Sequence, residues 1–139
     1  AQAIYKEWFI EFEFPNENGQ PYKSSGGKMV YNEELDKEIP KGWEVDNLER
    51  IILFKNGKSK PTNKGVFPLY GGNGIIDNVE KYNNENVIVI GRVGALYRVF
   101  AKCWISDNAI SGQSKINANM YSFCVLQNLN LNERSEGTG

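Results

Sequence analysis

The sequence predicts an α+β fold: an amphipathic N-terminal helix, then a mixed, twisted sheet with short helices. Apolar residues in the first twelve positions recur at helical spacing. The run 86–90 is almost entirely β-branched, which is typical of a strand. Glycine and proline punctuate much of the remaining sequence, as they do between strands. With 139 residues, 40% of them hydrophobic and 24% charged, the chain has the composition of about one globular domain.

The N-terminal helix is predicted over residues 1–12, where one wide apolar stripe runs at spacings of three and four. A stripe this rich in aromatic rings must be covered, so we interpret it as a partner-docking face. It consists of Ile4, Tyr5, Trp8, Phe9 and Phe12. The helix has no N-cap, and the polar residues 133–139 have no cap either. The simplest interpretation is a fragment cut at both ends, with residues 1–12 as the tail of a longer helix.

Residues 15–42 are expected to be an irregular, acidic linker, because turn-forming residues dominate this stretch. Residues 33–37 could form one helical turn, stopped before Pro40. The predicted organisation is therefore a helix over 1–14, a linker over 15–42 and a second, folded region over 43–139.

The second region begins at Trp43 with short elements. Asp46 or Asn47 is suited to cap a short helix over 48–51. Residues 51–54 are either a buried strand or the end of that helix, because periodicity cannot decide a run this short.

Extended segments separated by glycines follow. Residues 67–70 are predicted to lie at a sheet edge, since Pro68 has no N–H to donate to a neighbouring strand. Residues 71–74, Gly-Gly-Asn-Gly, predict a tight turn with positive φ angles. The run 86–90 predicts a central strand.

The C-terminal third is predicted to contain two strands and a helix. Residues 96–100 and 102–105 are interpreted as a strand pair. Asn117 or Asn119 can open a last helix that runs to about residue 129. Its expected apolar face consists of Met120, Phe123, Cys124, Leu126 and Gln127.

Charge is distributed unevenly. Residues 1–49 carry five Lys and eleven Asp or Glu, whereas residues 50–139 carry eleven Lys or Arg and six Asp or Glu. Within 50–64 there are five basic residues and no acid. A basic stretch in a glycine-rich setting is compatible either with contacts to phosphate groups or with a solvated loop.

Several functions are disfavoured by composition. The chain has no histidine, which excludes a Ser–His or Cys–His catalytic pair and histidine metal sites. Cys103 and Cys124 are too far apart for a CxxC motif, so we expect reduced, buried thiols in a cytoplasmic protein. No apolar run approaches the roughly 20 residues of a membrane helix. We expect no metal site.

Two motifs lack the residues their chemistry needs. The 71–74 turn does not match a phosphate-binding loop, and no Gly-Lys-Ser/Thr follows it. The segment 106–109 lacks the prolines of an amino-methyltransferase motif, so Asp107 is interpreted as a structural Asx turn. A nuclease would need carboxylates clustered near a lysine, and the nearest group lacks the usual spacing. That group is Asp77, Glu80, Lys81 and Glu85.

The segments 67–76, 89–94 and 104–109 resemble the target recognition domain of Type I restriction–modification specificity subunits. Residues 39–45 are similar to that family's domain start. Residues 1–9 are similar to the end of the conserved helix that precedes the family's second recognition domain.

The resemblance implies a non-catalytic subunit that reads one half of a split double-stranded DNA target. It implies methylation subunits and a restriction subunit as partners. S-adenosylmethionine is expected only on the methylation subunit, and no cofactor is expected on this chain. Residues 43–139 would be a recognition domain truncated at its C-terminal end, with specificity in variable segments such as 55–66 and 111–119.

The candidate DNA-binding residues are chosen by residue type and loop position. Lysines are expected on phosphates, while Tyr70, Asn73 and Arg92 are expected at base edges or in a groove. The full set is Lys58, Lys60, Lys64, Tyr70, Asn73, Arg92, Gln113 and Lys115. The alternative is a truncated or relic fragment that only docks methylation subunits, or associates with itself, through residues 1–12. An enzyme acting on a small molecule is disfavoured because no catalytic constellation is visible.

Overall fold

The computed structural model describes residues 1–129, so the predicted polar end at 133–139 lies outside the described residues. The chain forms two compact units, one over residues 1–47 and one that starts at Leu48.

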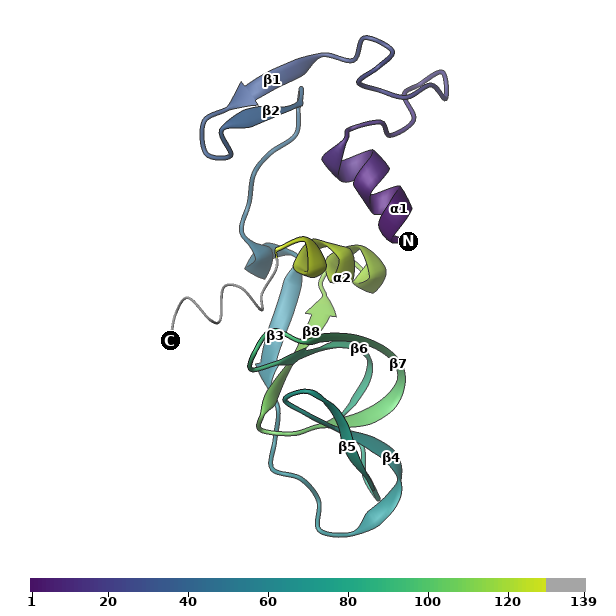
Figure 1. Ribbon diagram of the computed structural model, residues 1–139, viewed down its shortest axis with the longest axis vertical. Coiled ribbons are helices and arrows are strands. Elements are labelled where there is room, and N and C mark those ends of the chain that lie inside the picture. Colours follow the sequence, from purple (N-terminus) through teal and green to yellow (C-terminus); the bar gives the residue numbers. More distant parts are fainter. Residues whose placement is uncertain (130–139) are drawn as a thin grey trace. The chain divides into compact units, whose positions relative to one another are not determined.

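The first unit begins with the predicted N-terminal helix. Helix α1 (Gln2–Tyr5) continues without a break as a π-helical turn (Lys6–Ile10) (Figure 1). The helix stops two residues before its predicted end, because Phe12 adopts a left-handed conformation with φ of 60°. That backbone conformation cannot continue a right-handed helix.

An aromatic cluster forms the interior of the first unit. The Trp43 ring lies 6.1 Å from Phe9, 5.5 Å from Phe12 and 5.2 Å from Phe14, measured between ring centroids. The Phe14 ring also stacks on Tyr22 at 4.6 Å. Trp43, which the sequence predicts at the start of the second region, therefore packs against residues of the first.

The apolar stripe of the helix is only partly covered. Tyr5 and Phe12 are buried, and Phe9 is half-buried. Ile4 and Trp8 remain 53% and 36% exposed.

The predicted irregular linker contains a β-hairpin. Strands β1 (Met29–Asn32) and β2 (Lys37–Pro40) pair antiparallel, with Val30 opposite Ile39. The helical turn predicted at residues 33–37 is wrong. The Asn32 side chain accepts the Leu35 N–H and Asp36 has φ of 52°, which together form a turn between the strands.

The second unit is a mixed sheet with short helices, which confirms the predicted fold class. Its strands are ordered β3-β8-β6-β7-β4-β5 (Figure 1). All neighbours are antiparallel except β4 and β7, which are parallel. The strands are β3 (Ile52–Asn56), β4 (Lys64–Gly71), β5 (Gly74–Val79), β6 (Asn84–Gly91), β7 (Leu96–Ile105) and β8 (Ala109–Ser114).

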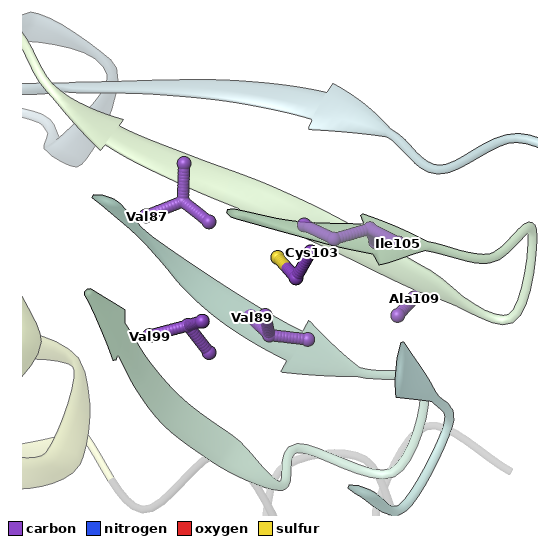
Figure 2. Close-up of a cluster of buried hydrophobic side chains, with 6 residues drawn as sticks. All are labelled: Val87, Val89, Val99, Cys103, Ile105 and Ala109. Atoms are coloured by element: carbon purple, nitrogen blue, oxygen red, sulfur yellow. The ribbon is translucent and has the colours of Figure 1, made fainter. Parts of the chain in front are cut away.

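Strand β6 is central, as predicted for residues 86–90, and its alternate side chains enter two cores. Val87 and Val89 join one apolar cluster. Figure 2 shows its side chains gathered between the strands: Val87, Val89, Val99, Cys103, Ile105 and Ala109. Ile88 and Ile90 point to the other side of the sheet, where they meet Ile52 and Leu126. The run is apolar throughout because both faces of β6 are covered.

Two predictions about strands are wrong. Pro68 does not lie at a sheet edge, since β4 has β5 on one side and β7 on the other. Its missing N–H is tolerated because β7 pairs with β4 only at Leu69 and Tyr70. The expected strand pair over residues 96–105 is one long strand, β7, which pairs with β6 first and then with β4.

The short helices agree better with prediction. A 3-10 helix covers Leu48–Arg50, and the undecided residues after it form strand β3. Helix α2 (Asn119–Asn128) begins at one of the two expected asparagines, but no side chain caps it. The Asn119 side chain instead accepts the Ser114 N–H. The buried face consists of Ser122, Cys124 and Leu126, whereas the expected Met120 is 41% exposed.

Cys103 and Cys124 are both free and buried, as predicted. Burial raises the pKa of the Cys103 thiol from 9.0 to about 11. The folded state therefore holds this thiol neutral where the unfolded state would ionise it. The resulting stabilisation is complete below pH 9 and is lost as the pH rises toward 11.

We expect both thiols to resist a disulfide exchange reagent at pH 8 in the folded protein, because only the exposed thiolate reacts quickly. Urea-unfolded protein should release two equivalents of thiol at once. The urea midpoint should fall between pH 9 and pH 11 and should fall less in Cys103→Val. Rapid labelling of folded protein at pH 8 would contradict the burial of these thiols.

Candidate nucleic-acid interface

Three turns of the second unit meet at the places where strands β4, β6 and β7 end. They are the β4–β5 turn at 72–73, the β6–β7 turn at 92–95 and the β7–β8 turn at 106–108. A Cβ atom added to Gly91 would lie 1.9 Å from the Gly72 carbonyl oxygen, so the first two turns touch through their backbones. A Cβ on Gly72 would lie 3.4 Å from the Asn108 carbonyl oxygen, which brings in the third turn.

The predicted tight turn over residues 71–74 is present. Gly71 pairs with Gly74 and closes the two-residue loop between β4 and β5. Gly74 has φ of 108°, a conformation that favours glycine. Asn73 is thereby exposed at the tip of the loop.

The basic loop after β3 is tied to the same edge. The N–H of Gly57 donates to the Ala109 carbonyl at 2.9 Å, and the N–H of Lys58 donates to the Ile105 carbonyl at 3.0 Å. The indole N–H of Trp104 donates to the Lys58 carbonyl at 3.1 Å. We call residues 57–58 together with the three turns the turn edge.

A shallow hollow of about 350 Å³ opens on the turn edge. It is lined by Gly72, Asn73, Arg92, Val93 and Asn108. One Nη atom of Arg92 donates to the Asp107 carbonyl at 3.5 Å, which is at the limit of a hydrogen bond.

The β7–β8 turn is organised by a residue other than the predicted one. The Ser106 hydroxyl, not the Asp107 carboxylate, accepts the N–H of Asn108. The Ser106 N–H in turn donates to the Tyr70 carbonyl, which fixes this turn to the end of β4.

The structure brings Lys58, Asn73 and Arg92 together at the turn edge. Tyr70 faces the core instead. Its ring is half-buried against the apolar cluster and lies 5.8 Å from the Tyr97 ring. Burial raises the pKa of the Tyr70 hydroxyl.

The other candidate residues lie elsewhere. Lys64 begins β4 at the end away from the turn, and its amine lies 3.7 Å from the Asp77 carboxylate. Gln113 is opposite Leu53 near the far end of β8. Each residue of a strand adds about 3.3 Å, so Gln113 lies well away from the turn that precedes β8. The Lys115 amine donates to the Glu49 carbonyl beyond that end.

The two units carry net charges of opposite sign. Residues 1–47 carry five Lys against ten Asp or Glu, while residues 48–129 carry ten Lys or Arg against five. The pKa of the Asp77 carboxyl is lowered, chiefly by the Asn78 N–H and then by Lys64 and Lys60. Lys60 and Lys64 thus share one carboxylate, whereas the charges of Lys58 and Arg92 are exposed at the turn edge.

Within the described part of the chain, no three His, Cys, Asp or Glu side chains gather in a way that could hold a metal ion. None of the helices in residues 1–129 is both long and apolar enough to cross a bilayer.

Sequence reasoning missed two residues of the hollow, Val93 and Asn108. Both lie in segments that carry the family resemblance, 89–94 and 104–109. The signal was therefore present in the motifs, but only Arg92 and Asp107 were singled out from them.

No protein-family model matches the chain. It is 43% identical over 67 residues to the Type I restriction enzyme MjaIX specificity subunit of Methanocaldococcus jannaschii. That match covers 48% of this chain and 13% of the relative.

Two solved structures share the fold. The S subunit of a Type I restriction–modification system from M. genitalium matches with a TM-score of 0.55 and 24% identity, over 65% of this chain and 28% of that one. The HsdS subunit from Thermoanaerobacter tengcongensis matches with a TM-score of 0.51 and 12% identity, over 95% of this chain and 35% of that one.

The chain thus spans about a third or less of the relatives it matches. The sequence match and the two fold matches nevertheless agree with each other and with the motifs. They confirm that this chain resembles the target recognition domain of a Type I restriction–modification specificity subunit, in sequence over about half its length and in fold over most of it.

Proposed function

We propose that the second unit reads double-stranded DNA as a recognition domain of a Type I specificity subunit and catalyses no reaction itself. One observation supports the proposal most directly. The three turns formed by the family-like segments meet at the turn edge, and the basic loop is hydrogen-bonded to it. Positive charge next to polar turns is the arrangement that duplex DNA favours.

Within this proposal, Lys58 contacts a phosphate, which positions the protein without reading sequence. Asn73 and Arg92 face the groove, where amide and guanidinium groups can pair with base edges. Tyr70 supports the fold. Lys60 and Lys64 are left out of the proposed interface because both act on the Asp77 carboxylate, away from the turn edge. Gln113 and Lys115 are left out because they lie at the far end of β8.

The wider assembly is also part of the proposal. A recognition domain of this kind would read one half of a split target for partner methylation and restriction subunits in the cytoplasm. S-adenosylmethionine would bind to the methylation subunit.

The test is fluorescence anisotropy of the 139-residue chain on random-sequence duplex DNA over a series of salt concentrations. Each phosphate contact contributes about 0.9 to the slope of log affinity against log salt. We expect Lys58→Ala to lower the magnitude of the slope by about 1. Lys115→Ala removes an equally exposed charge from the far end of β8 and should leave the slope unchanged.

A slope that is the same in Lys58→Ala and in the unsubstituted chain would remove Lys58 from the interface. The absence of any binding at low salt would overturn the DNA-reading function itself.

A second candidate function belongs to the first unit. Ile4 and Trp8 form an exposed apolar pair on a helix whose other aromatic residues are already covered, which favours docking to a methylation subunit. Ile4→Ala/Trp8→Ala should weaken co-purification with that subunit at least tenfold and leave DNA affinity unchanged. Equal recovery of the two chains would contradict docking through this face.

A further inference from the structure

The hollow on the turn edge holds two asparagine side chains that the fold does not use. The Asn108 backbone is fixed by the Ser106 hydroxyl, and Asn73 is fixed by the β4–β5 turn. Both residues are exposed, and within residues 1–129 neither side-chain amide makes a hydrogen bond. Two asparagines on fixed backbone therefore line one hollow, and their amides are available to another molecule.

The remaining lining narrows the kind of group that fits there. Val93 is 58% exposed and places an apolar surface beside the amides. Arg92 supplies the single positive charge among the five lining residues, and its guanidinium leans toward the Asp107 carbonyl. A phosphate site is usually built from several charged or N–H donors, whereas Arg92 is the single charged donor of this lining. A carboxamide offers one donor and one acceptor side by side, which matches the edge of a base.

Adenine is the base that this chemistry fits best. In the major groove it presents the N7 acceptor beside the N6 amino donor, and an asparagine amide pairs with both. Its partner thymine presents a methyl group, for which an exposed valine is a suitable contact. A hollow of about 350 Å³ that is open to solvent is large enough for one base edge and too shallow to enclose a whole nucleotide.

We propose that this hollow is a base-reading subsite that accepts the adenine edge of an A·T pair, with Asn108 and Asn73 as its specificity-determining residues and Val93 against the thymine methyl. The inference rests on the proposed DNA-reading function and goes beyond it by assigning Asn108 and the base. It also places part of the specificity within the family-like segments, outside 55–66 and 111–119.

The experiment selects bound sequences from a randomised duplex pool with the 139-residue chain and reads the enriched bases by sequencing. The unsubstituted chain should enrich at least one position in adenine. Asn108→Ala and Asn108→Leu, which add no charge, should each reduce that preference about tenfold and leave affinity for unselected random DNA within twofold. Asn78→Ala, at the other end of β5, removes an exposed asparagine outside the hollow and should change neither quantity.

Three results would overturn the inference in distinguishable ways. An adenine preference that survives in both Asn108 variants and in Asn73→Ala would remove the hollow from base reading and leave DNA binding intact. An equal loss of affinity for every sequence would make the hollow a phosphate contact. Failure of the unsubstituted chain to bind the pool at low salt would overturn the proposed function along with the inference. Circular dichroism of each variant verifies that it is folded.

Discussion

Gly91→Ala is expected to destabilise the second unit by about 3 kcal/mol, at the upper end of the range for an overpacked site. The added Cβ would lie 1.9 Å from the Gly72 carbonyl oxygen and 2.9 Å from its carbon. Both obstructing atoms belong to the backbone of a closed turn, so no side-chain rotation can relieve the clash. The β4–β5 turn and the end of β6 must move apart.

The measurement is urea denaturation followed by circular dichroism and tryptophan fluorescence. Gly112→Ala is the matched control, because a Cβ there would meet Ile52, Ile88 and Ile90 at 3.4 to 3.6 Å, which is ordinary van der Waals contact. Its midpoint should stay close to that of the unsubstituted chain. If the two alanine variants have the same stability, the backbone contact between the turns is not as close as the structure shows.

This contact also links stability to function. The hollow exists only while the β4–β5 and β6–β7 turns touch, because its lining residues come from both. A Gly91→Ala protein that remains folded at low temperature should therefore lose DNA affinity as well, whereas Gly112→Ala should keep it.

The sequence predicts correctly those elements that depend only on residues close together in the chain. The N-terminal helix, the central run 86–90 and the glycine turn at 71–74 each follow from spacing, β-branching or positive φ, and all three are present. The buried thiols follow from composition and are also confirmed.

What sequence could not predict depends on pairing between distant strands. The missing N–H of Pro68 predicts a sheet edge, but β7 pairs with β4 over only two residues and Pro68 is not one of them. Residues 96–105 were divided in two because a strand that changes partners resembles two strands. The hairpin of β1 and β2 was hidden in a stretch rich in turn residues.

The candidate site shows the same limit. Residue type alone points to Lys58, Asn73 and Arg92 separately, and only the folded sheet shows that they lie together at the turn edge. Gln113 and Lys115 are equally polar, yet strand β8 carries them to its other end. Asn108 has no distinguishing pattern in the sequence, because its neighbour Asp107 is an equally suitable turn residue.

Ile88→Ala is expected to lower the free energy of unfolding of the second unit by 2 to 5 kcal/mol, roughly the range for removing a buried isoleucine side chain. Ile88 is 0% exposed in the central strand, and it packs with Ile52, Ile90 and Leu126 between the sheet and helix α2. The loss combines transfer of the side chain to water with the cavity left behind, because strands on both sides limit collapse. Small domains have only about 5 to 15 kcal/mol of stability in total, so this one change removes a large share of it.

Ile76→Ala is the matched control, since it deletes the same atoms from a side chain that is 61% exposed on β5. Its unfolding free energy should change by no more than about 0.5 kcal/mol. Trp104 is the one tryptophan among residues 48–129, so its emission reports on this unit, while Trp8 and Trp43 report on the first. Equal midpoints for the two isoleucine variants would contradict a two-sided core around β6. A shift in Ile88→Ala alone would mean that the packing between β6 and α2 stabilises the second unit, through the same strand that carries Gly91 at its end.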